Sequence, residues 1–266
     1  MGKLFGRQLS RRTFLGGAVA AAGMGLTACG NNNNNNASNT SDVKGEAGGG
    51  TITAGAAYST QNYDPSSTSS ALALGVNWQV SEGLYGMNYH DYHVFNELAT
   101  ADPQKVDDTT FEVSIRKDAK FSDGTAVSAD DVVESFKRAT AEGNIYVSML
   151  APIASVEKKD DTTVIIKTNV PDFSLLKERL SIVRVVPAKS AQDDMKKMPV
   201  GSGPWMYKTI SDNSLDLEPN PNYNGVTPAK DKALHYDILK DPTARLTAQT
   251  DGTTLAMEMV PADAID

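Results

Sequence analysis

Residues 111–136 read FEVSIRKDAKFSDGTAVSADDVVESF, and this stretch predicts a strand, a turn and a helix in that order. Apolar and polar residues alternate from Phe111 to Ile115, which is typical of a half-buried strand. Asp123-Gly124 then indicates a turn. Ser128 and Asp131 have capping-box spacing, so a helix is expected to begin there. A strand followed closely by a helix favours a fold that mixes both kinds of element.

The helix predicted after Ser128 is amphipathic. Its apolar side carries Val132 and Phe136, whereas Lys137 and Arg138 can face water. We expect it to end by Gly143.

Similar patterns on either side of this stretch predict further elements. Strands are expected at residues 51–57, 164–166, 182–186, 215–218 and 234–238. Helices are expected over 71–84 and from Asp241-Pro242, an N-cap followed by a first-turn proline, to Gln249. Because several strands are joined by turns rather than by helical crossovers, the sequence predicts a mixed α/β (α+β) fold rather than a doubly wound parallel sheet.

The N-terminus has the pattern of an export signal. The first 28 residues contain four cations and no acid, and the pair Arg11-Arg12 precedes a mildly apolar run, Phe14–Leu26. This run is too short for a membrane-spanning helix, which needs about 20 residues. We therefore expect a signal peptide over 1–28. The adjacent arginines favour the twin-arginine type, and an ordinary Sec signal is the alternative.

The single cysteine, Cys29, follows this run in Leu-Thr-Ala-Cys-Gly, which resembles a bacterial lipobox. A lipidated Cys29 would become the first residue of the mature protein and would anchor it to the outer face of the membrane. Residues 29–50 consist mainly of Asn, Ser, Thr, Ala and Gly, so they are expected to form a disordered linker. The globular part is expected to begin at Thr51.

The composition excludes several classes of function. The net charge is −8 and the first 28 residues carry +4, so the rest carries −8 − 4 = −12, which makes it a poor partner for nucleic acid. One cysteine permits neither an intrachain disulfide nor a cysteine-rich zinc site. Gly50–Gly55 lacks the lysine of a phosphate-binding loop, and no Gly-x-Ser-x-Gly elbow occurs. No cofactor is expected, and an extracytoplasmic hydrolase is only a distant alternative.

His90 and His93 are weak candidates for a metal site. They could share one face of a helical turn and bind a metal together with Asp91. The alternative is that both are surface or packing residues.

The stretch 111–136 also resembles a signature of the solute-binding proteins of peptide-type ABC importers, the oligopeptide- and dipeptide-binding family 5. The matching motifs are Phe-Ser-Asp-Gly-Thr at 121–125, Asp-Asp-Val at 130–132 and Ser-Phe at 135–136. Further similar motifs lie at 63–65, 82–85, 96–99, 199–204 and 218–223. The resemblance runs from about Thr51 to the C-terminus. It departs at Trp205, where the family usually has tyrosine.

This resemblance implies a lobe like that of type II periplasmic binding proteins. Lobe I is expected at 51–85 and 188–266, with an inserted subdomain at 86–187. Members of the family are about twice as long, so the chain is expected to be the N-terminal part and to lack the second large lobe. An inactive truncated product is an alternative.

The resemblance further implies a binding protein, not an enzyme. It would capture di- to oligopeptides outside the membrane, deliver them to an ABC permease and act as a monomer. The residues that the resemblance places at the ligand cleft are Ser66, Ser67, Ser69, Ser70, Tyr146, Gly201, Gly203 and Trp205. For Tyr146 the alternative is a core or surface tyrosine. A metal chelate or another small solute is the alternative ligand.

Overall fold

The stretch from Phe111 to Phe136 folds as its pattern predicts in the computed structural model, which describes residues 49–264. Thr110–Ser114 form strand β5 and Ala129–Ala139 form helix α2. The backbone N–H of Ser128 donates to Asp131 Oδ2 at 2.7 Å, so the helix begins with the expected capping interaction. The predictions for 1–28, for Cys29 and for most of the 29–50 linker lie outside the described residues.

Strand β5 belongs to an antiparallel sheet with the order β4-β5-β7-β6. The other strands are β4 (Gln104–Lys105), β6 (Ile153–Asp160) and β7 (Thr163–Thr168). Phe111 lies opposite Ile166, and helix α2 packs its buried Val132 and Phe136 into the same core. This part of the fold is therefore built around residues 111–136.

The second sheet has the order β11-β1-β10-β9-β8. Its strands are β1 (Thr51–Ala56), β8 (Trp205–Ile210), β9 (Ser214–Pro219), β10 (Ala233–Ile238) and β11 (Ala256–Met257). Strand β1 runs parallel to β10 and β11, whereas β10, β9 and β8 pair antiparallel. This mixed sheet, together with the helices, confirms the predicted mixed α/β class.

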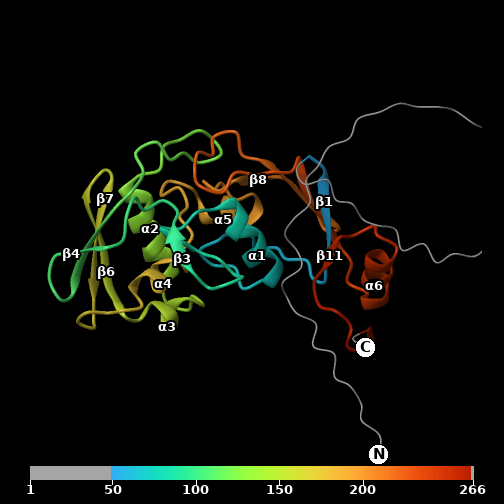
Figure 1. Cartoon of the computed structure of the whole chain (residues 1–266), viewed down its shortest axis with the longest axis horizontal. Coiled ribbons are helices and arrows are strands. Elements are labelled where there is room, and N and C mark those ends of the chain that lie inside the picture. Colours follow the sequence, from blue (N-terminus) through green and yellow to red (C-terminus); the bar gives the residue numbers. More distant parts are fainter. Residues whose placement is uncertain (1–48, 265–266) are drawn as a thin grey trace, which may run out of the picture. The chain divides into compact units, whose positions relative to one another are not determined.

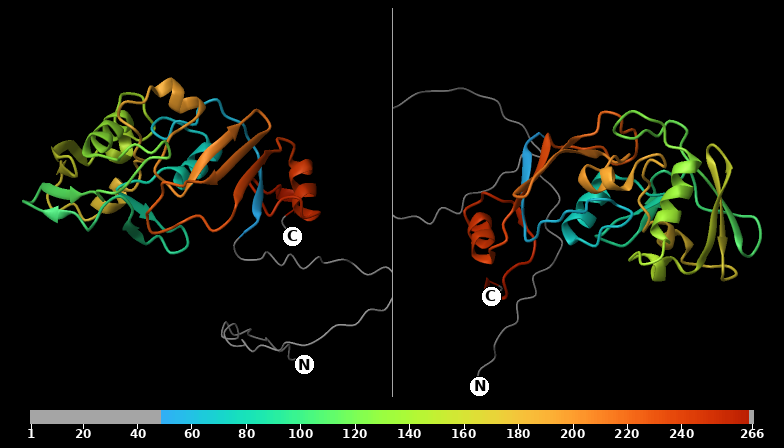
Figure 2. Two further views of the ribbon diagram at one scale, coloured as in Figure 1. Left: turned by 90° about the horizontal axis from the view of Figure 1, so that it is seen from above. Right: turned by 180° about the vertical axis from the view of Figure 1, so that it is seen from behind.

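The remaining elements connect or cover the two sheets. A short hairpin consists of β2 (Tyr85–Met87) and β3 (Val94–Asn96). The helices are α1 (Ala71–Val80), α3 (Val147–Leu150), α4 (Leu176–Leu180), α5 (Gln192–Lys197), α6 (Pro242–Thr250) and the 3₁₀ turn η1 (Ala262–Ala264). Figures 1 and 2 show the two sheets at opposite ends of the described part, with α1 between them. None of the helices within 49–264 has both the length and the apolar character to cross a membrane.

Two separate clusters of buried side chains form the core. One surrounds α2 and the four-stranded sheet and extends from Leu84 to Val185. The other lies between α1 and the five-stranded sheet, where Val76 and Val80 meet strand residues such as Leu217. Each sheet therefore has its own hydrophobic core.

The prediction of a strand at 182–186 is wrong. Residue 182 lies in a turn, and residues 183–186 pair with no strand in the described part of the chain, because their backbone groups bond to two other partners. The N–H of Val185 donates to the carbonyl of Glu82 at 2.8 Å, and the N–H of Val186 donates to Ser135 Oγ at 2.9 Å. An alternating apolar pattern here reflects burial between elements rather than a place in a sheet.

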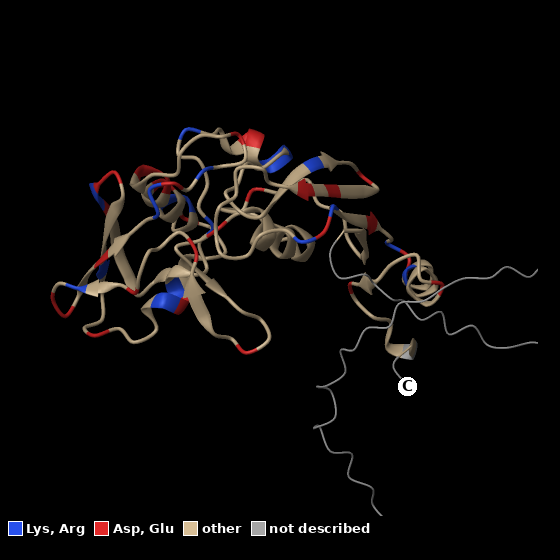
Figure 3. Ribbon diagram, turned by 45° about the horizontal axis from the view of Figure 1, so that its top comes forward, with Lys and Arg blue, Asp and Glu red and all other residues tan. Residues whose placement is uncertain are grey.

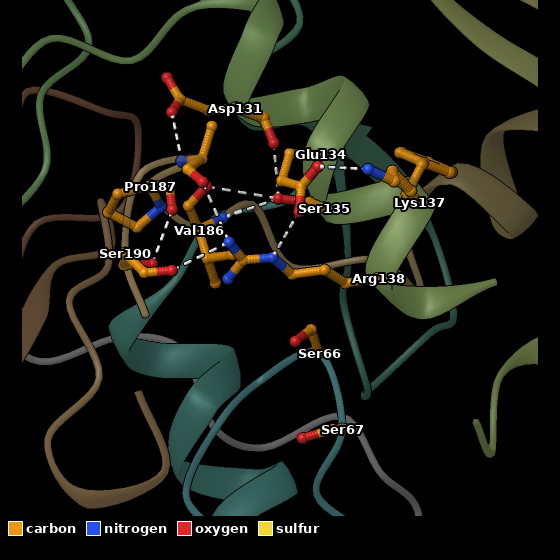
Figure 4. A network of polar contacts seen from close by, with 12 residues as sticks. Ser66, Ser67, Asp131, Glu134, Ser135, Lys137, Arg138, Val186, Pro187 and Ser190 are labelled. Atoms are coloured by element: carbon orange, nitrogen blue, oxygen red, sulfur yellow. Dashed lines mark hydrogen bonds and ion pairs between the residues drawn. The ribbon is translucent and has the colours of Figure 1, made fainter. Parts of the chain in front are cut away.

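Arg138 was expected to face water, and this is also wrong. Its side chain reaches from α2 to the segment that leads back to the five-stranded sheet, as Figure 4 shows. Its Nη2 donates to the carbonyls of Ala188 and Ser190, both at 3.0 Å, and its Nε to Glu134 at 3.0 Å. Burial of this arginine fixes where the chain leaves the first core.

A buried ion network lies beside the start of the β2–β3 hairpin. Arg116 Nη2 donates to Glu82 Oε1 at 2.9 Å, and Arg184 Nη1 donates to Glu97 Oε2 at 2.8 Å. Burial raises the pKa of Glu82 to about 7, although the charge of Arg116 acts in the opposite direction. The network ties the chain just after β5 to the chain that follows α1, and the 183–185 segment to the chain that follows β3.

Candidate functional site

Helix α1 turns one side to the core and the other side outward. Ser70 caps it, with its Oγ accepting from the Ala73 N–H at 3.5 Å. Ala71 and Gly75 are exposed on the outward side, and Trp78 is half-buried. The helix carries no charged side chain, as its tan colour in Figure 3 shows. An uncharged helical face is thus available beside the five-stranded sheet.

Two hollows flank this face. The first, the strand hollow, has a volume of about 300 Å³. It is lined by α1 and by the strands β1, β10 and β11, through Gly75, Gln79, Ala54, Tyr236 and Met257 among others. The second, the loop hollow, has about 370 Å³ and is lined by Tyr58, Ser59, Thr60, Asn62, Thr68, Ser69, Ser70 and Ala71. Both hollows reach Ala71, and both have the size of small-ligand sites.

Polar groups of side chains and of the backbone lie at these hollows. Gln79 Nε2 donates to the Tyr236 hydroxyl at 3.0 Å, and Glu258 Oε2 accepts from the Ala57 N–H at 2.9 Å. Beyond Ala57, the N–H groups of Tyr58 and Ser59 have no hydrogen-bond partner among the described residues. These donors can pair with the backbone of an extended ligand.

The four predicted serines divide into two pairs. Ser66 and Ser67 are held by the buried Asp64: Ser66 Oγ donates to Oδ1 at 2.7 Å, and Ser67 Oγ donates to Oδ2 at 3.0 Å. Ser69 and Ser70 line the loop hollow. The first pair therefore shapes the loop, and the second pair reaches the hollow.

Tyr146 lies beside the same loop, although it comes much later in the sequence. Asn144 joins the two segments, because its Nδ2 donates to the Ser66 carbonyl at 2.6 Å and its Oδ1 accepts from the Tyr146 N–H at 3.0 Å. Tyr146 is 8% exposed. Burial raises the pKa of Tyr146, with the Arg184 charge opposing and the Asp64 charge adding to this shift. The structure thus brings together the serine loop and Tyr146.

An aromatic pair at the end of α1 was not predicted. Trp78 and Tyr89 pack edge to face with ring centroids 5.3 Å apart, and the Arg184 guanidinium lies 3.9 Å from the Trp78 ring centroid. Tyr89 is 60% exposed, so this pair offers an open aromatic surface. The signal in the sequence was the spacing of Trp78, seven residues after Ala71 on the same helical side.

Gly201, Gly203 and Trp205 lie on the other side of α1. The Gly203 N–H donates to the Val80 carbonyl at 2.7 Å, and a Cβ at either glycine would overlap that carbonyl group. The close backbone approach is therefore made to the last turn of α1. Trp205 is 7% exposed and belongs to the core between α1 and the sheet. None of the three lines either hollow.

His90 and His93 lie in the exposed loop between β2 and β3. They do not share a helical turn, because the N–H groups of His90 and His93 donate to Asn88 Oδ1 and Asp91 Oδ1 in two successive tight turns. Within residues 49–264 no three His, Cys, Asp or Glu side chains are grouped so that they could hold a metal ion.

Comparison with known families identifies the chain. Residues 93–266, well over half of its length, match the model of the bacterial extracellular solute-binding proteins, family 5, middle region. The chain belongs to this family. The predicted resemblance to family 5 is therefore confirmed.

Relatives of this family 5 chain have names that point to several ligands. A Brucella ovis protein named for peptide binding with an ABC transporter is 28% identical over 218 residues, which is 76% of this chain and 41% of that protein. The oligopeptide-binding protein AppA of Bacillus subtilis is 29% identical over 57% of this chain and 30% of its own length. The nickel-binding periplasmic protein of Escherichia coli is 26% identical over 59% of this chain and 32% of its own length. The family 5 chain spans less than half the length of these relatives.

Solved structures share the fold. The periplasmic binding protein DppA of Helicobacter pylori, in complex with the peptide STSA, matches with a TM-score of 0.73 at 19% identity, over 82% of this chain and 48% of that one. AppA of Bacillus subtilis, in complex with a nonapeptide, matches with a TM-score of 0.69 at 21% identity, over 78% of this chain and 44% of that one. Both structures cover most of the described family 5 chain.

Proposed function

We propose that this chain is the peptide-binding part of a solute-binding protein that serves an ABC importer and has no catalytic role. The observation that carries the proposal is the pair of N–H groups at Tyr58 and Ser59, which have no partner within residues 49–264 and lie at the edge of a hollow beside an uncharged helix. An extended peptide can accept hydrogen bonds from these groups as an added strand would. The names of the Brucella and Bacillus relatives support the same class of ligand.

The peptide would lie across the outward face of α1. Its backbone would bond near Ser59, and its side chains would enter the strand hollow and the loop hollow on either side of Ala71. Tyr146 and the Trp78–Tyr89 pair would bound the far end of the site. Backbone recognition with roomy hollows would accept varied side chains, as a nutrient importer requires.

Titration of the ¹⁵N-labelled chain with tri-L-alanine tests this proposal. We expect saturable amide shifts at Ser59, Thr60 and Gly75. Gly75→Arg would place a long side chain into the strand hollow and abolish the shifts, because nothing lies within 4 Å of a Cβ at this position and the helix stays intact. Thr250→Arg, on α6, is the matched control and should leave them unchanged. Saturable binding that spares these amides, or no binding at all, would contradict the proposal.

We also propose the lobe boundaries that the family resemblance implied. Residues 51–85 and 188–266 would form lobe I, and residues 86–187 would form the inserted subdomain. The two hydrophobic clusters support this division, except that Leu84 and Tyr85, at the end of the first lobe I segment, belong to the cluster of the inserted subdomain. A second lobe of a longer protein would close over α1 by hinge motion and present the loaded form to the permease, with one copy sufficient for binding. Expression of residues 86–187 alone should give a cooperatively folded unit, and an unfolded product would contradict the division.

A nickel chelate is a second candidate ligand, favoured by the Escherichia coli relative named for nickel binding. His90 and His93 are the first residues to test, since both side chains are exposed in one loop. Isothermal titration with nickel and L-histidine should then give heat that His90→Ala removes. Equal heats for both proteins would exclude these histidines.

For localisation we propose export and anchoring by a lipid on Cys29, after cleavage of a twin-arginine signal. The support is the motif pattern of residues 1–29 together with the extracellular family. Cys29→Ser should release the protein from membranes in cell fractionation. A serine variant that stays with the membrane would contradict lipid anchoring, and export that persists with Arg11→Lys and Arg12→Lys would favour the Sec route.

A further inference from the structure

A third hollow lies on the other side of the loop that follows β1. It has a volume of about 520 Å³ and is bounded by that loop, by the end of α5 and by the turn between β8 and β9. Its lining includes Tyr63, Lys197, Met198, Ile210 and Asp212. We call it the rear hollow. Thr60 lines both the rear hollow and the loop hollow, so one loop separates them.

Tyr63 places an unused hydrogen-bonding group at the rear hollow. The residue is 2% exposed, and its hydroxyl has no hydrogen-bond partner among the described residues. The ring packs edge to face on Tyr207 with centroids 5.8 Å apart, and the backbone of Tyr63 is held through its carbonyl, which accepts from Asn77 Nδ2 at 2.8 Å. Burial, with the charge of Asp212 adding to its effect, raises the pKa of Tyr63, so the hydroxyl is protonated. Buried hydroxyls without partners are uncommon and call for an explanation.

Charges of both signs line the rear hollow. Lys197 and Asp212 are exposed, and neither makes an ion pair within the described part of the chain. Lys196, the other cation of the lining, already pairs with Asp193 at 2.9 Å. One cation and one anion are therefore available on the same hollow.

The walls between these charges are apolar. Met198 is 42% exposed, which is unusual for a large hydrophobic side chain, and Ile210 lies beside it in the lining. A ligand that matches all of these groups has a carboxylate for Lys197, an ammonium for Asp212 and an apolar side chain for Met198. Either charged end can bond with the Tyr63 hydroxyl.

We propose that the rear hollow is a second binding site, for a small zwitterion with an apolar side chain such as a free α-amino acid. This site is separate from the proposed peptide site and does not depend on it. Because Thr60 belongs to both walls, occupancy of one site can alter the loop that forms the other.

The test is an amide-shift titration of the whole chain with three probes of similar size. L-Leucine has both charges, isovalerate lacks the ammonium and isopentylamine lacks the carboxylate. We expect saturable shifts with L-leucine at Lys197, Ser211 and Asp212, and binding of the other two probes that is weaker by about tenfold. Tyr63→Phe should weaken L-leucine binding about fivefold.

Variants on the surface keep the test independent of folding. Asp212→Asn changes an exposed turn and should remove the preference for L-leucine over isovalerate. Equal binding of all three probes, unchanged affinity in Asp212→Asn, or no saturable shift at these amides would overturn the proposal. Tri-alanine shifts at Ser59 and Gly75 in the same sample report on the peptide site, so failure of one site is distinguishable from failure of the other.

Discussion

The two sheets of this chain are built from similar strands, yet their surroundings differ. The four-stranded sheet buries one face under α2 and carries exposed ion pairs, such as Lys159 with Glu112 at 2.6 Å and Lys167 with Glu157 at 3.0 Å. The five-stranded sheet is only partly covered by α1, and hollows remain where β1 ends. The first region thus has the features of a stable support, and the second has the features of a recognition surface. This division can be tested by variants in each region.

The largest effect on stability is expected in the core of the four-stranded sheet. Ile166 is fully buried on β7, so Ile166→Ala should lower the free energy of unfolding by about 2–5 kcal/mol in urea denaturation. The exposed Val170→Ala is the control and should change it little. Under conditions in which the variant is folded, its affinity for tri-alanine should equal that of the parent chain. Loss of affinity would show that the two regions are not separate in function.

The ion network beside the two cores should make stability depend on pH. The pKa of Glu82 is about 7 in the folded chain and 4.5 ordinarily, so the folded state binds this proton more tightly than the unfolded state does. The free energy of unfolding should therefore fall by about 3 kcal/mol as the pH rises from about 4.5 to about 7. Urea midpoints across this range should show the slope in the parent chain and lose it in Glu82→Gln. Equal slopes would exclude Glu82 as the cause.

At Gly75, on the outward face of α1, the effect of a substitution on stability can be measured apart from its effect on binding. Gly75→Ala should raise the free energy of unfolding by about 0.5–1 kcal/mol, because glycine disfavours a helix interior and the added Cβ meets no atom within 4 Å. Thermal unfolding checks this gain. A loss of stability would mean that the outward face of α1 is packed against something.

The smallest effect is expected among the surface ion pairs. Lys158 lies 2.8 Å from both Asp130 and Asp161, but all three side chains are solvated. Lys158→Met should therefore leave the urea midpoint unchanged at moderate salt. A clear drop in the urea midpoint would show that these ion pairs stabilise the region of the four-stranded sheet more than their exposure suggests.

Local patterns in the sequence predicted much of the fold. β1, β5, β7, β9, β10, α2 and α6 all have either clean alternation or clear caps, and the structure contains them. β6 was missed because Glu157-Lys158-Lys159-Asp160 reads as a polar loop, although it forms a solvated strand edge. β8 was missed because Gly201 and Gly203 drew attention to a turn just before it. Residues 182–186 have the sequence pattern of a strand, but no neighbouring strand in the described part of the chain pairs with them.

The site was less predictable because it is assembled from distant segments. Ser66 and Tyr146 were identified only through family resemblance, and their contact depends on Asn144, which no local pattern marks. The strand hollow depends on β1 pairing with β10 and β11, which lie near the other end of the chain. Trp78 was missed because the periodicity of α1 directs attention to its buried side.

The most direct test of the account is the hydrogen-exchange rate of the Tyr58 and Ser59 amides with and without saturating tri-alanine. Both N–H groups lack a partner among the described residues, so they should exchange quickly in the free chain. We predict that bound peptide slows both rates at least tenfold, while the exposed amide of Gly252 in the turn after α6 keeps its rate. Unchanged rates at Tyr58 and Ser59 in a chain that demonstrably binds the peptide would contradict backbone pairing at the end of β1.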